Sequence, residues 1–314
     1  AENVRHLFVQ ISALLREQVS AQGRGQPIMQ GMGCYGGIRW AAIGHKVILV
    51  QTPVSSNSFP AMEIIPIPAF RDNYIWTLVQ GKYAVCVDPG EAAPVQQFLT
   101  QHDLSLTAVI NTHHHWDHTG GNTVLIDRSH IPLFGPKNEA IEGLTHKLAE
   151  GDEVSLAEIG LQLRVFDIPG HTSGHIALYN DEMLFCGDTL FACGCGRLFE
   201  GTPEQMSASL EKLAALNKDT KIYCGHEYTL ANIAFAKAVE PHNQKITERE
   251  KREAAKRAEN KPTLPSTISE ELATNPFLRC EEPAVIQAAE KYAGKSLNNK
   301  VAVFAALRVW KNNF

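Results

Sequence analysis

Hydrophobic and polar positions fall into short strand-like and helix-like runs from Met62 onward. Residues 75–79 and 83–87 are rich in β-branched and aromatic side chains, and the three residues QGK between them predict a β-hairpin. Residues 92–102 have helical spacing, and 106–110 form another short apolar run. This order of strand, helix and strand is typical of an α/β domain.

The middle of the chain predicts further strands. They are expected at 131–134, at the alternating apolar positions of 161–165 and at 221–224. The stretch HIALYNDEMLFC predicts a hairpin with its turn at Asn180 and Asp181. Adjacent hairpins of this kind favour antiparallel sheets with helices outside.

Helices dominate the end of the chain. Thr202 as N-cap and Pro203 at the first helical position predict a helix start, and from residue 229 the pattern is mainly helical. Glutamate and arginine lie four residues apart in EREKREAAKRAEN, which predicts a solvated helix face. We therefore expect a main domain over 62–229 and a smaller helical domain over 230–314.

Residues 1–61 differ from the rest in composition. They hold five basic but only two acidic residues, a glycine-rich patch GRGQPIMQGMGCYGG and a polar QTPVSSNS segment. An acid-poor stretch with arginines is compatible with a transit peptide. The simpler interpretation is an N-terminal extension that is not part of the fold.

Composition limits the partners and the compartment. The net charge is -5 over 314 residues without a long basic run, which argues against nucleic acid. No apolar run reaches the roughly 18 residues of a membrane span, so no membrane is expected. The seven cysteines do not form a disulfide framework, and the N-terminus lacks a signal-peptide pattern. We expect a monomer in the cytoplasm that acts on a small molecule.

The run NTHHHWDHTGGN concentrates metal-ligand side chains directly after the predicted strand 106–110. His113 and His115 lie two positions apart, so an extended segment presents both on one side. Asp117 and His118 can then turn toward a second position nearby. Imidazole and carboxylate suit zinc and other first-row metals, so the HxHxDH spacing supplies the beginning of two metal sites.

Three later clusters supply further ligands. IPGHTSGH contains His171, LFCGDTLF contains Asp188 and IYCGHEYT contains His226, each just after a short apolar run. Strand ends can converge on one edge of a sheet, and the two oxygens of Asp188 could bridge two cations. The predicted ligands are then His113, His115 and His171 for one cation and Asp117, His118 and His226 for the other.

The remaining candidates have simpler interpretations. Within the motif, His114 and Trp116 point elsewhere. His175 is expected beside the ligands or as a hydrogen-bonded core residue. Cys193 and Cys195 are more simply explained by packing in a tight turn than by metal or redox chemistry, because the four-cysteine pattern of a structural zinc site is absent.

These stretches together resemble the metallo-β-lactamase superfamily and, within it, the glyoxalase II or hydroxyacylglutathione hydrolase family. The resemblance covers 62–314 and rests on IPAFRDNYIW, VDPG, THHHWDHTGGN, PGHTSGH, FCGDTLF, GCGRLFEGT, CGHEYTLAN, NPFLR and FAALRVWKNNF. The HxHxDH motif alone marks only the superfamily. GCGRLFEGT, CGHEYT and the final RxxK are far more specific.

The resemblance implies an α/β fold, an αβ/βα sandwich whose catalytic domain is followed by a helical domain that helps to hold glutathione. It also implies the two-cation assignment, with zinc expected and iron or manganese as alternatives. Arginine grips carboxylates such as those of glutathione with paired hydrogen bonds. The implied glutathione contacts are Arg197, Tyr228, Arg308, Lys311 and Phe199, which stands where relatives have tyrosine.

The expected reaction is hydrolysis of S-D-lactoylglutathione and related 2-hydroxyacyl thioesters to D-lactate and glutathione, the second step of methylglyoxal detoxification. A hydroxide that bridges the two cations, positioned by Asp117 and Asp188, would attack the carbonyl carbon. One alternative is a glutathione persulfide dioxygenase with a single iron, which is expected to lack the full second ligand set. Another is a metal-stabilised glutathione-binding module without turnover.

Overall fold

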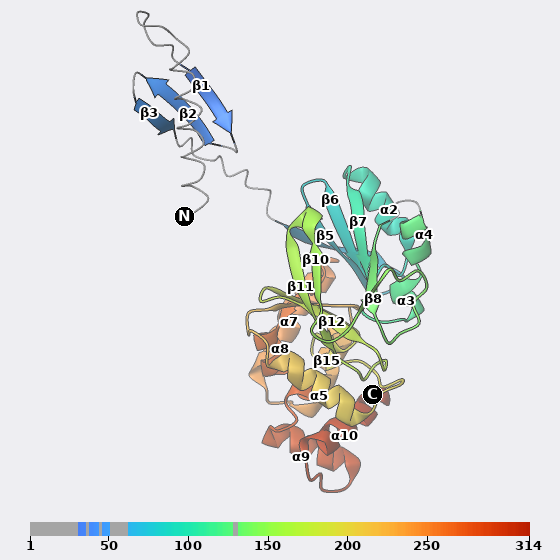
Figure 1. The fold of residues 1–314 in the computed structure, drawn as a ribbon. Helices are drawn as coiled ribbons and strands as arrows, with labels where there is room; N and C mark the ends of the chain where they lie inside the picture. Colours follow the sequence, from blue (N-terminus) through green and yellow to red (C-terminus); the bar gives the residue numbers. More distant parts are fainter. Residues whose placement is uncertain (1–30, 36–37, 44–45, 51–61, 128–130) are drawn as a thin grey trace, which may run out of the picture. The chain divides into compact units, whose positions relative to one another are not determined.

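Residues 31–35, 38–43, 46–50, 62–127 and 131–314 are described by the computed structural model, and the chain divides into the units Ala1–Ser58 and Phe59–Phe314. In the first unit, three strands pair antiparallel in chain order: β1 (Gly31–Tyr35), β2 (Ile38–Ile43) and β3 (Lys46–Val50) (Figure 1). The sequence patterns had predicted no element in this range. Its place outside the fold of the second unit stays a prediction.

The first sheet of the second unit has the strand order β4-β5-β6-β7-β8-β9. Its strands are β4 (Glu63–Ala69), β5 (Asn73–Gln80), β6 (Tyr83–Val87), β7 (Ser105–Ile110), β8 (Leu133–Pro136) and β9 (His146–Leu148). β5 and β6 form the predicted hairpin, whereas the pairs from β6 to β9 are parallel. Helix α2 (Ala92–Gln101) connects β6 to β7 and returns the chain to the end of the sheet at which β6 begins, so that the two strands run parallel. The sheet is therefore mixed.

The second sheet has the order β10-β11-β12-β13-β16-β17 and is antiparallel except between β13 and β16. Its strands are β10 (Glu153–Leu156), β11 (Leu161–Asp167), β12 (Ile176–Tyr179), β13 (Met183–Gly187), β16 (Lys221–Cys224) and β17 (Ser266–Thr267). A small hairpin, β14 (Leu190–Phe191) with β15 (Gly194–Cys195), follows β13. Along β11, Leu161, Leu163 and Val165 are buried and the residues between them are exposed, as the alternation predicted.

The main core lies between the two sheets. Trp76 from β5 packs in one apolar cluster with Leu163 of β11 and Phe185 of β13. The neighbouring Ile75 points to the other face of the first sheet, where it packs with Val109 and Val95 beneath α2 and α4 (Asn122–Asp127). Helix-covered sheets that share one core confirm the predicted α/β sandwich.

The helices of the C-terminal part lie at the end of the unit away from α2 (Figure 1). They are α6 (Thr229–Val239), α7 (Gln244–Ala258), α8 (Ile268–Thr274), α9 (Pro283–Ala293) and α10 (Lys300–Asn312), with a 3₁₀ turn at Pro276–Leu278. Helix α5 (Pro203–Ala214), which comes earlier in the chain, lies at the same end (Figure 1), and another 3₁₀ turn, Ala157–Ile159, joins β10 to β11. Thr202 caps α5 by accepting a hydrogen bond from Gln205 N, as predicted. Within the described ranges, no helix combines the length and apolar character needed to cross a membrane.

The charged run in α7 is not a purely solvated face. Arg249 and Glu253 are each only 2% exposed. Arg252 pairs with Glu253 and with Glu270 of α8 rather than with a residue four positions away. The prediction is wrong for these side chains because α8 packs against this face and supplies Glu271 as a buried partner for Arg249, at 2.6 Å.

Candidate active site and metal centre

The predicted metal ligands all follow the ends of strands. The histidine-rich motif leaves β7 and enters the short helix α3 (Trp116–Thr119), which carries Asp117 and His118. His171, Asp188 and His226 follow β11, β13 and β16 within a few residues. The sandwich therefore brings together side chains that lie more than 100 positions apart, such as His118 and His226.

Three histidines form a first group. The Nδ1 atom of His115 lies 3.1 Å from Nε2 of His113 and 3.0 Å from Nε2 of His171. His113 and His171 are buried and His115 is half-buried. Their ring nitrogens lie within 4.8 Å of one another, so one cation could contact all three.

Asp117, His118 and His226 form a second group. The Nε2 atoms of the two histidines are 3.4 Å apart. The Oδ2 atom of Asp117 lies 3.6 Å from Nε2 of His118 and 3.5 Å from Nε2 of His226. This group also has one donor atom from each member within 4.8 Å.

Asp188 stands between the two groups. Its Oδ2 lies 3.5 Å from His171 and 3.2 Å from His226, and its Oδ1 lies 3.4 Å from His118. Burial opposes ionisation of this carboxyl, but the nearby His226 and His118 outweigh it and hold the pKa of Asp188 well below its usual range. The ionised carboxylate therefore faces both groups.

The hydrogen bonds on the outer side of the rings determine which nitrogen carries a lone pair. Nδ1 of His171 faces the Arg197 carbonyl oxygen at 2.9 Å, and Nδ1 of His226 faces the Asp72 carboxylate at 2.8 Å. Both partners can only accept, so each Nδ1 carries the hydrogen and each Nε2 presents a lone pair to the centre. Burial lowers the pKa of His113 well below its usual value and keeps that ring neutral.

This donor set fits divalent cations. Lone pairs of several imidazoles and two carboxylates converge, and Asp188 Oδ1 is buried without any hydrogen-bond donor from the described chain. Nitrogen and oxygen donors in this arrangement are typical of zinc and related metals. The donor atoms of both groups are therefore suited to binding a cation.

Residues around the ligands were missed by the sequence analysis. Buried Asp88 accepts hydrogen bonds from Thr112 N at 2.8 Å and Thr112 Oγ1 at 2.7 Å, and its Oδ2 lies 3.1 Å from His118 Nδ1 at ion-pair distance without hydrogen-bond alignment. Asn73 donates to Asp117 Oδ2 at 3.0 Å. The segments VDPG and RDNY contain these residues, but only the Asp88 carboxylate, directly after β6, could have pointed to the site.

Glu139 links the two histidine loops from behind and was also missed. Its carboxylate accepts hydrogen bonds from the backbone N of His114, from Thr172 Oγ1 and from Gly174 N, and it lies 2.9 Å from His114 Nδ1. His114 is therefore directed away from both groups, as expected.

His175 lies behind the first group, as expected for a residue beside the ligands. It is fully buried and stacks on His113 with 4.5 Å between ring centroids. Its Nδ1 is 3.0 Å from the Ile176 carbonyl oxygen, so its Nε2 accepts the hydrogen bond from Asp188 N at 3.2 Å. The ring thereby holds the backbone of Asp188.

A hollow of about 760 Å³ opens beside the two groups. Its lining includes metal-ligand candidates of both groups as well as Arg308 and Lys311 of α10. The residues that the resemblance assigned to glutathione all line this hollow, namely Arg197, Phe199, Tyr228, Arg308 and Lys311.

Two aromatic side chains border the ligands within this hollow. Phe199 is 64% exposed and meets the His171 ring edge to face at 5.3 Å. Tyr228 stacks on His226 at 4.7 Å, and burial raises the pKa of its hydroxyl. Trp116 also lines the hollow and is 68% exposed.

The two cations of α10 differ in their surroundings. Arg308 is 5% exposed and donates from Nη1 to the Cys195 carbonyl oxygen at 2.7 Å. Lys311 is half-buried and donates to the Ala231 carbonyl oxygen at 3.1 Å. Burial, and then the charge of Arg308, lowers the pKa of Lys311 to about 8.

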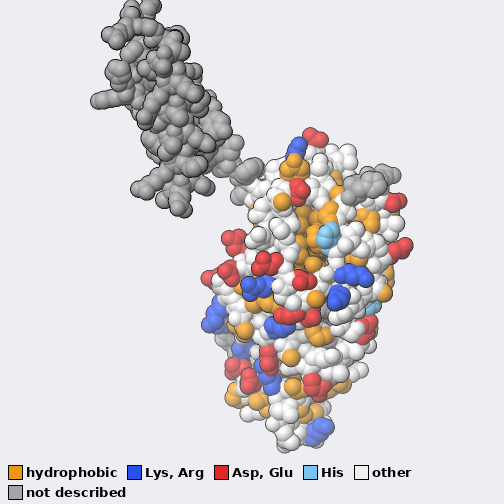
Figure 2. Space-filling view, viewed as in Figure 1, with side chains coloured by type: hydrophobic (Ala, Val, Ile, Leu, Met, Phe, Trp, Pro, Cys, Tyr) orange, Lys and Arg blue, Asp and Glu red, His pale blue; other side chains and the backbone are white. Residues whose placement is uncertain are grey.

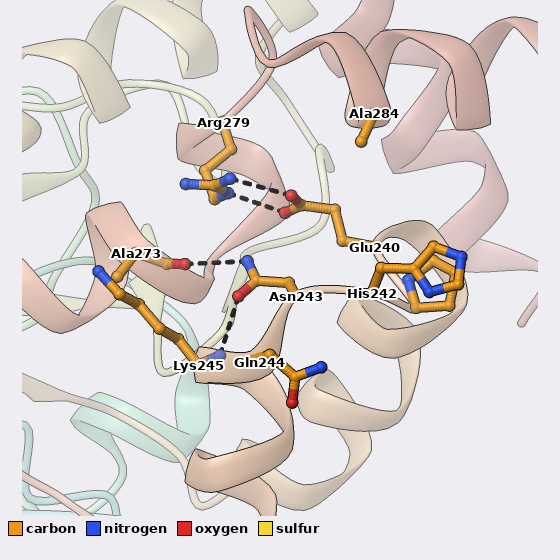
Figure 3. Close-up of a pocket in the computed structure, with 9 residues that line it drawn as sticks. Glu240, His242, Asn243, Gln244, Lys245, Ala273, Arg279 and Ala284 are labelled. Atoms are coloured by element: carbon orange, nitrogen blue, oxygen red, sulfur yellow. Dashed lines mark hydrogen bonds and ion pairs between the residues drawn. The ribbon is translucent and has the colours of Figure 1, made fainter.

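A second hollow lies in the helical part, between the start of α7 and α9 (Figure 3). Its carboxylate and guanidinium, Glu240 and Arg279, are paired with each other at 2.8 and 2.9 Å. Asn243 caps α7 and donates to the Ala273 carbonyl oxygen at 3.1 Å.

On the face drawn in Figure 2, acidic and basic side chains are interspersed, and neither kind forms a patch of one charge.

Comparison with known proteins gives two matching family models. Residues 70–226 match the metallo-β-lactamase superfamily, and residues 227–314 match the hydroxyacylglutathione hydrolase C-terminus. The hydroxyacylglutathione hydrolase of Nitrosomonas europaea is 53% identical over 253 residues, which cover 81% of this chain and 97% of that protein. The one from Alkalilimnicola ehrlichii is 54% identical, covering 80% of this chain and 98% of that protein.

Solved structures resemble the fold at lower identity. ETHE1 from Myxococcus xanthus aligns with a TM-score of 0.55 and 23% identity, over 80% of this chain and 97% of that chain. The B3 metallo-β-lactamase BLEG-1 aligns with a TM-score of 0.51 and 22% identity, over 69% of this chain and 99% of that chain. These similarities confirm the metallo-β-lactamase fold.

Proposed function

Because the chain belongs to the hydroxyacylglutathione hydrolase family of the metallo-β-lactamase superfamily, we propose that it hydrolyses S-D-lactoylglutathione to D-lactate and glutathione. The observation that carries this proposal is the single hollow in which two metal-ligand groups face three cationic side chains. The first feature suits hydrolysis and the second suits a substrate with two carboxylates. Together they suit a glutathione thioester, and the proposed reaction would be the second step of methylglyoxal detoxification.

His113, His115 and His171 would hold one divalent cation and Asp117, His118 and His226 the other, with Asp188 shared. When bound, these cations would lower the pKa of a shared water and polarise the thioester carbonyl. The chain's own part is orientation. Asp117 and Asp188 would present acceptor oxygens to the reacting water, and the hydrogen bond that Asp188 N donates to His175 Nε2 holds the backbone of Asp188.

Substrate binding is assigned to the cationic wall of the hollow. Arg197, Arg308 and Lys311 provide the charge that complements the two carboxylates of glutathione. The Tyr228 hydroxyl can donate a hydrogen bond because its raised pKa keeps it protonated. Phe199 has no hydroxyl and provides only packing at this position. The thiolate product needs no strong acid, since a thiol pKa is roughly 8 to 9.

Three finer points belong to the same proposal. Zinc is the preferred metal because nitrogen donors dominate the first group, with iron or manganese as alternatives. A monomeric state is part of the same proposal, and the mass of the protein in solution would test it. The cytoplasm is proposed because the six cysteines of 62–127 and 131–314 are free and buried, as suits a reducing compartment.

The test is hydrolysis of S-D-lactoylglutathione by protein of measured metal content. Chelation should abolish turnover and added metal should restore it. Asp188→Ala should lower kcat by roughly 100- to 1000-fold, because it removes the charge shared by both groups. Asp181→Ala, at an exposed turn, is the control and should leave kcat unchanged. Near-normal turnover by Asp188→Ala would contradict the two-cation mechanism.

The single-iron dioxygenase is the less favoured reading, because Asp117, His118 and His226 form a complete second group. The binding module is less favoured too, since the family consists of hydrolases by name. Oxygen uptake with glutathione persulfide would support the first. Tight glutathione binding without hydrolysis would support the second.

A further inference from the structure

The turn Leu190–Cys195 joins residues of the active site. Asp188 precedes it and Arg197 follows it, and the Gly196 N–H returns to the Thr189 carbonyl oxygen at 3.1 Å. The Arg197 carbonyl oxygen in turn accepts from His171 Nδ1. The path of this turn therefore determines where a shared carboxylate, a substrate cation and a histidine of the first group lie.

Side chains from the helical part hold the backbone of this turn at every residue from 191 to 195. Asn275 donates to the carbonyl oxygens of Phe191 at 3.2 Å and Gly194 at 2.9 Å. The other contacts are Asn232 to Ala192 O at 3.0 Å, Cys193 N to Glu271 Oε2 at 2.7 Å, and Arg308 to Cys195 O at 2.7 Å. The turn is thus held by residues far along the chain in addition to the pairing of its own two short strands.

A buried ion pair supports the central contact. Glu271 is fully buried, and Arg249, 2% exposed, donates to its Oε1 at 2.6 Å. Its Oε2 remains free to accept from Cys193 N and from Asn275 Nδ2, the latter at 3.0 Å. Cys193 has a φ of 59°, a left-handed conformation that a non-glycine residue keeps only when its surroundings hold it.

Stability alone does not explain this arrangement. Buried ion pairs contribute little net stability compared with apolar packing, because both charges lose their hydration. What they provide here is direction, since Glu271 and Asn275 meet three backbone groups of one turn. Neither residue lines the hollow, so neither contacts the substrate directly.

We propose that Glu271 and Asn275 are positioning residues for thioester hydrolysis, which hold the turn Leu190–Cys195 and through it the substrate-binding Arg197. This inference rests on the proposed function. The NPFLR segment, which begins at Asn275, then has a role in holding the turn Leu190–Cys195. The helical part then shapes the active site from behind in addition to lining it.

The test compares two asparagines. Asn275 caps the Pro276–Leu278 turn with its Oδ1 and donates to the 191–195 backbone with its Nδ2. Asn243 caps α7 with its Oδ1 and donates to the carbonyl oxygen of Ala273, a residue that does not belong to the turn (Figure 3). Both variants remove a capping hydrogen bond and side-chain donation to backbone carbonyl oxygens, but only Asn275→Ala releases the turn.

For Asn275→Ala, we expect KM for S-D-lactoylglutathione to rise roughly 5- to 10-fold, with kcat per metal-loaded chain within about twofold, because misplaced binding groups weaken substrate binding first. Amide hydrogen exchange should accelerate within residues 189–197. Asn243→Ala should lower the melting temperature without either change.

Equal KM values and equal exchange at 189–197 in both variants would overturn the proposal. If Asn275→Ala does not fold, Glu271→Gln is measured against Glu240→Gln by the same two criteria. Exchange does not require substrate, so it still decides the positioning role if the wild-type protein proves inactive on the thioester. Inactivity of the wild-type protein on the thioester would refute the proposed function instead.

Discussion

The two ligand groups differ in what holds their outer sides. His171 of the first group donates to a backbone carbonyl oxygen, that of Arg197. The second group relies on side chains, with Asp72 behind His226 and Asn73 behind Asp117. In the first group, His113 has a side-chain hydroxyl at its outer nitrogen, that of Thr112 at 3.0 Å. Outer partners fix the orientation of a ligand and increase its basicity, so loss of the Asp72 carboxylate should affect the second group.

Asp72→Ala is therefore expected to weaken the second cation selectively. Loss of the 2.8 Å contact to His226 Nδ1 should reduce affinity for that cation by roughly 10- to 100-fold, while the other remains bound. Metal content after dialysis against graded chelator should fall toward one cation per chain. Asp181→Ala should retain both. Equal loss of both cations would show that Asp72 supports the fold and not one group.

At the scale of elements, helix α10 is buried through apolar side chains and carries a charged side chain into the lining of the hollow. Val303, Phe304 and Leu307 are buried in the main core. One turn further, Lys311 reaches the hollow, and its amino group lies 5.3 Å from the Phe235 ring centre. The last turn of α10 thus provides a positive charge in surroundings that partly exclude water.

Substrate binding should weaken as pH rises through about 8, where Lys311 loses its proton because burial and Arg308 disfavour the charged form. KM should therefore increase between pH 7 and pH 9. Lys311→Arg should remove this increase, since arginine stays charged. The measurement is KM across the pH range for both proteins. An unchanged slope in the variant would assign the effect to another group.

The stability effect of this lysine has the opposite direction. Its folded pKa lies below the ordinary value of 10.5, so between these values the unfolded chain binds more protons. The free energy of unfolding should then rise with pH in that window. Denaturation of wild type and Lys311→Met at pH 8 and pH 10 would isolate this contribution as the difference between the two proteins.

At the scale of the whole molecule, the second unit contains every ligand candidate and the main core. Hydroxyacylglutathione hydrolases match about four fifths of this chain over nearly their whole length. The catalytic part 62–229 and the helical part 230–314 share one apolar cluster. We therefore propose that they fold together and that 1–61 is not needed for hydrolysis.

A chain that starts at Phe59 should keep the melting temperature of the full chain, and its kcat/KM should stay within about twofold. The reason is that a domain with its own core does not depend on a separate unit for its internal contacts. Thermal unfolding and thioester hydrolysis would check this. A large loss of either quantity would show that residues before the division support the second unit.

Local patterns were sufficient for much of the fold. The hairpin of β5 and β6, the strand before the histidine-rich motif and the start of α5 follow from neighbouring residues. The mixed pairing of the first sheet did not follow, since strand direction depends on how crossovers pack. The burial of Arg249 was missed for the same reason, because its partner Glu271 lies on another helix.

The sequence by itself determined the chemistry and the family, because metal ligands keep short spacings and sit at recognisable strand ends. Only the tertiary structure decided which side chains stand behind those ligands. Asp72 meets His226 across 154 positions, and Glu271 meets Cys193 across 78. Such pairs leave no local pattern, since a single hydrogen bond between distant residues forms only when the sheets and helices have packed.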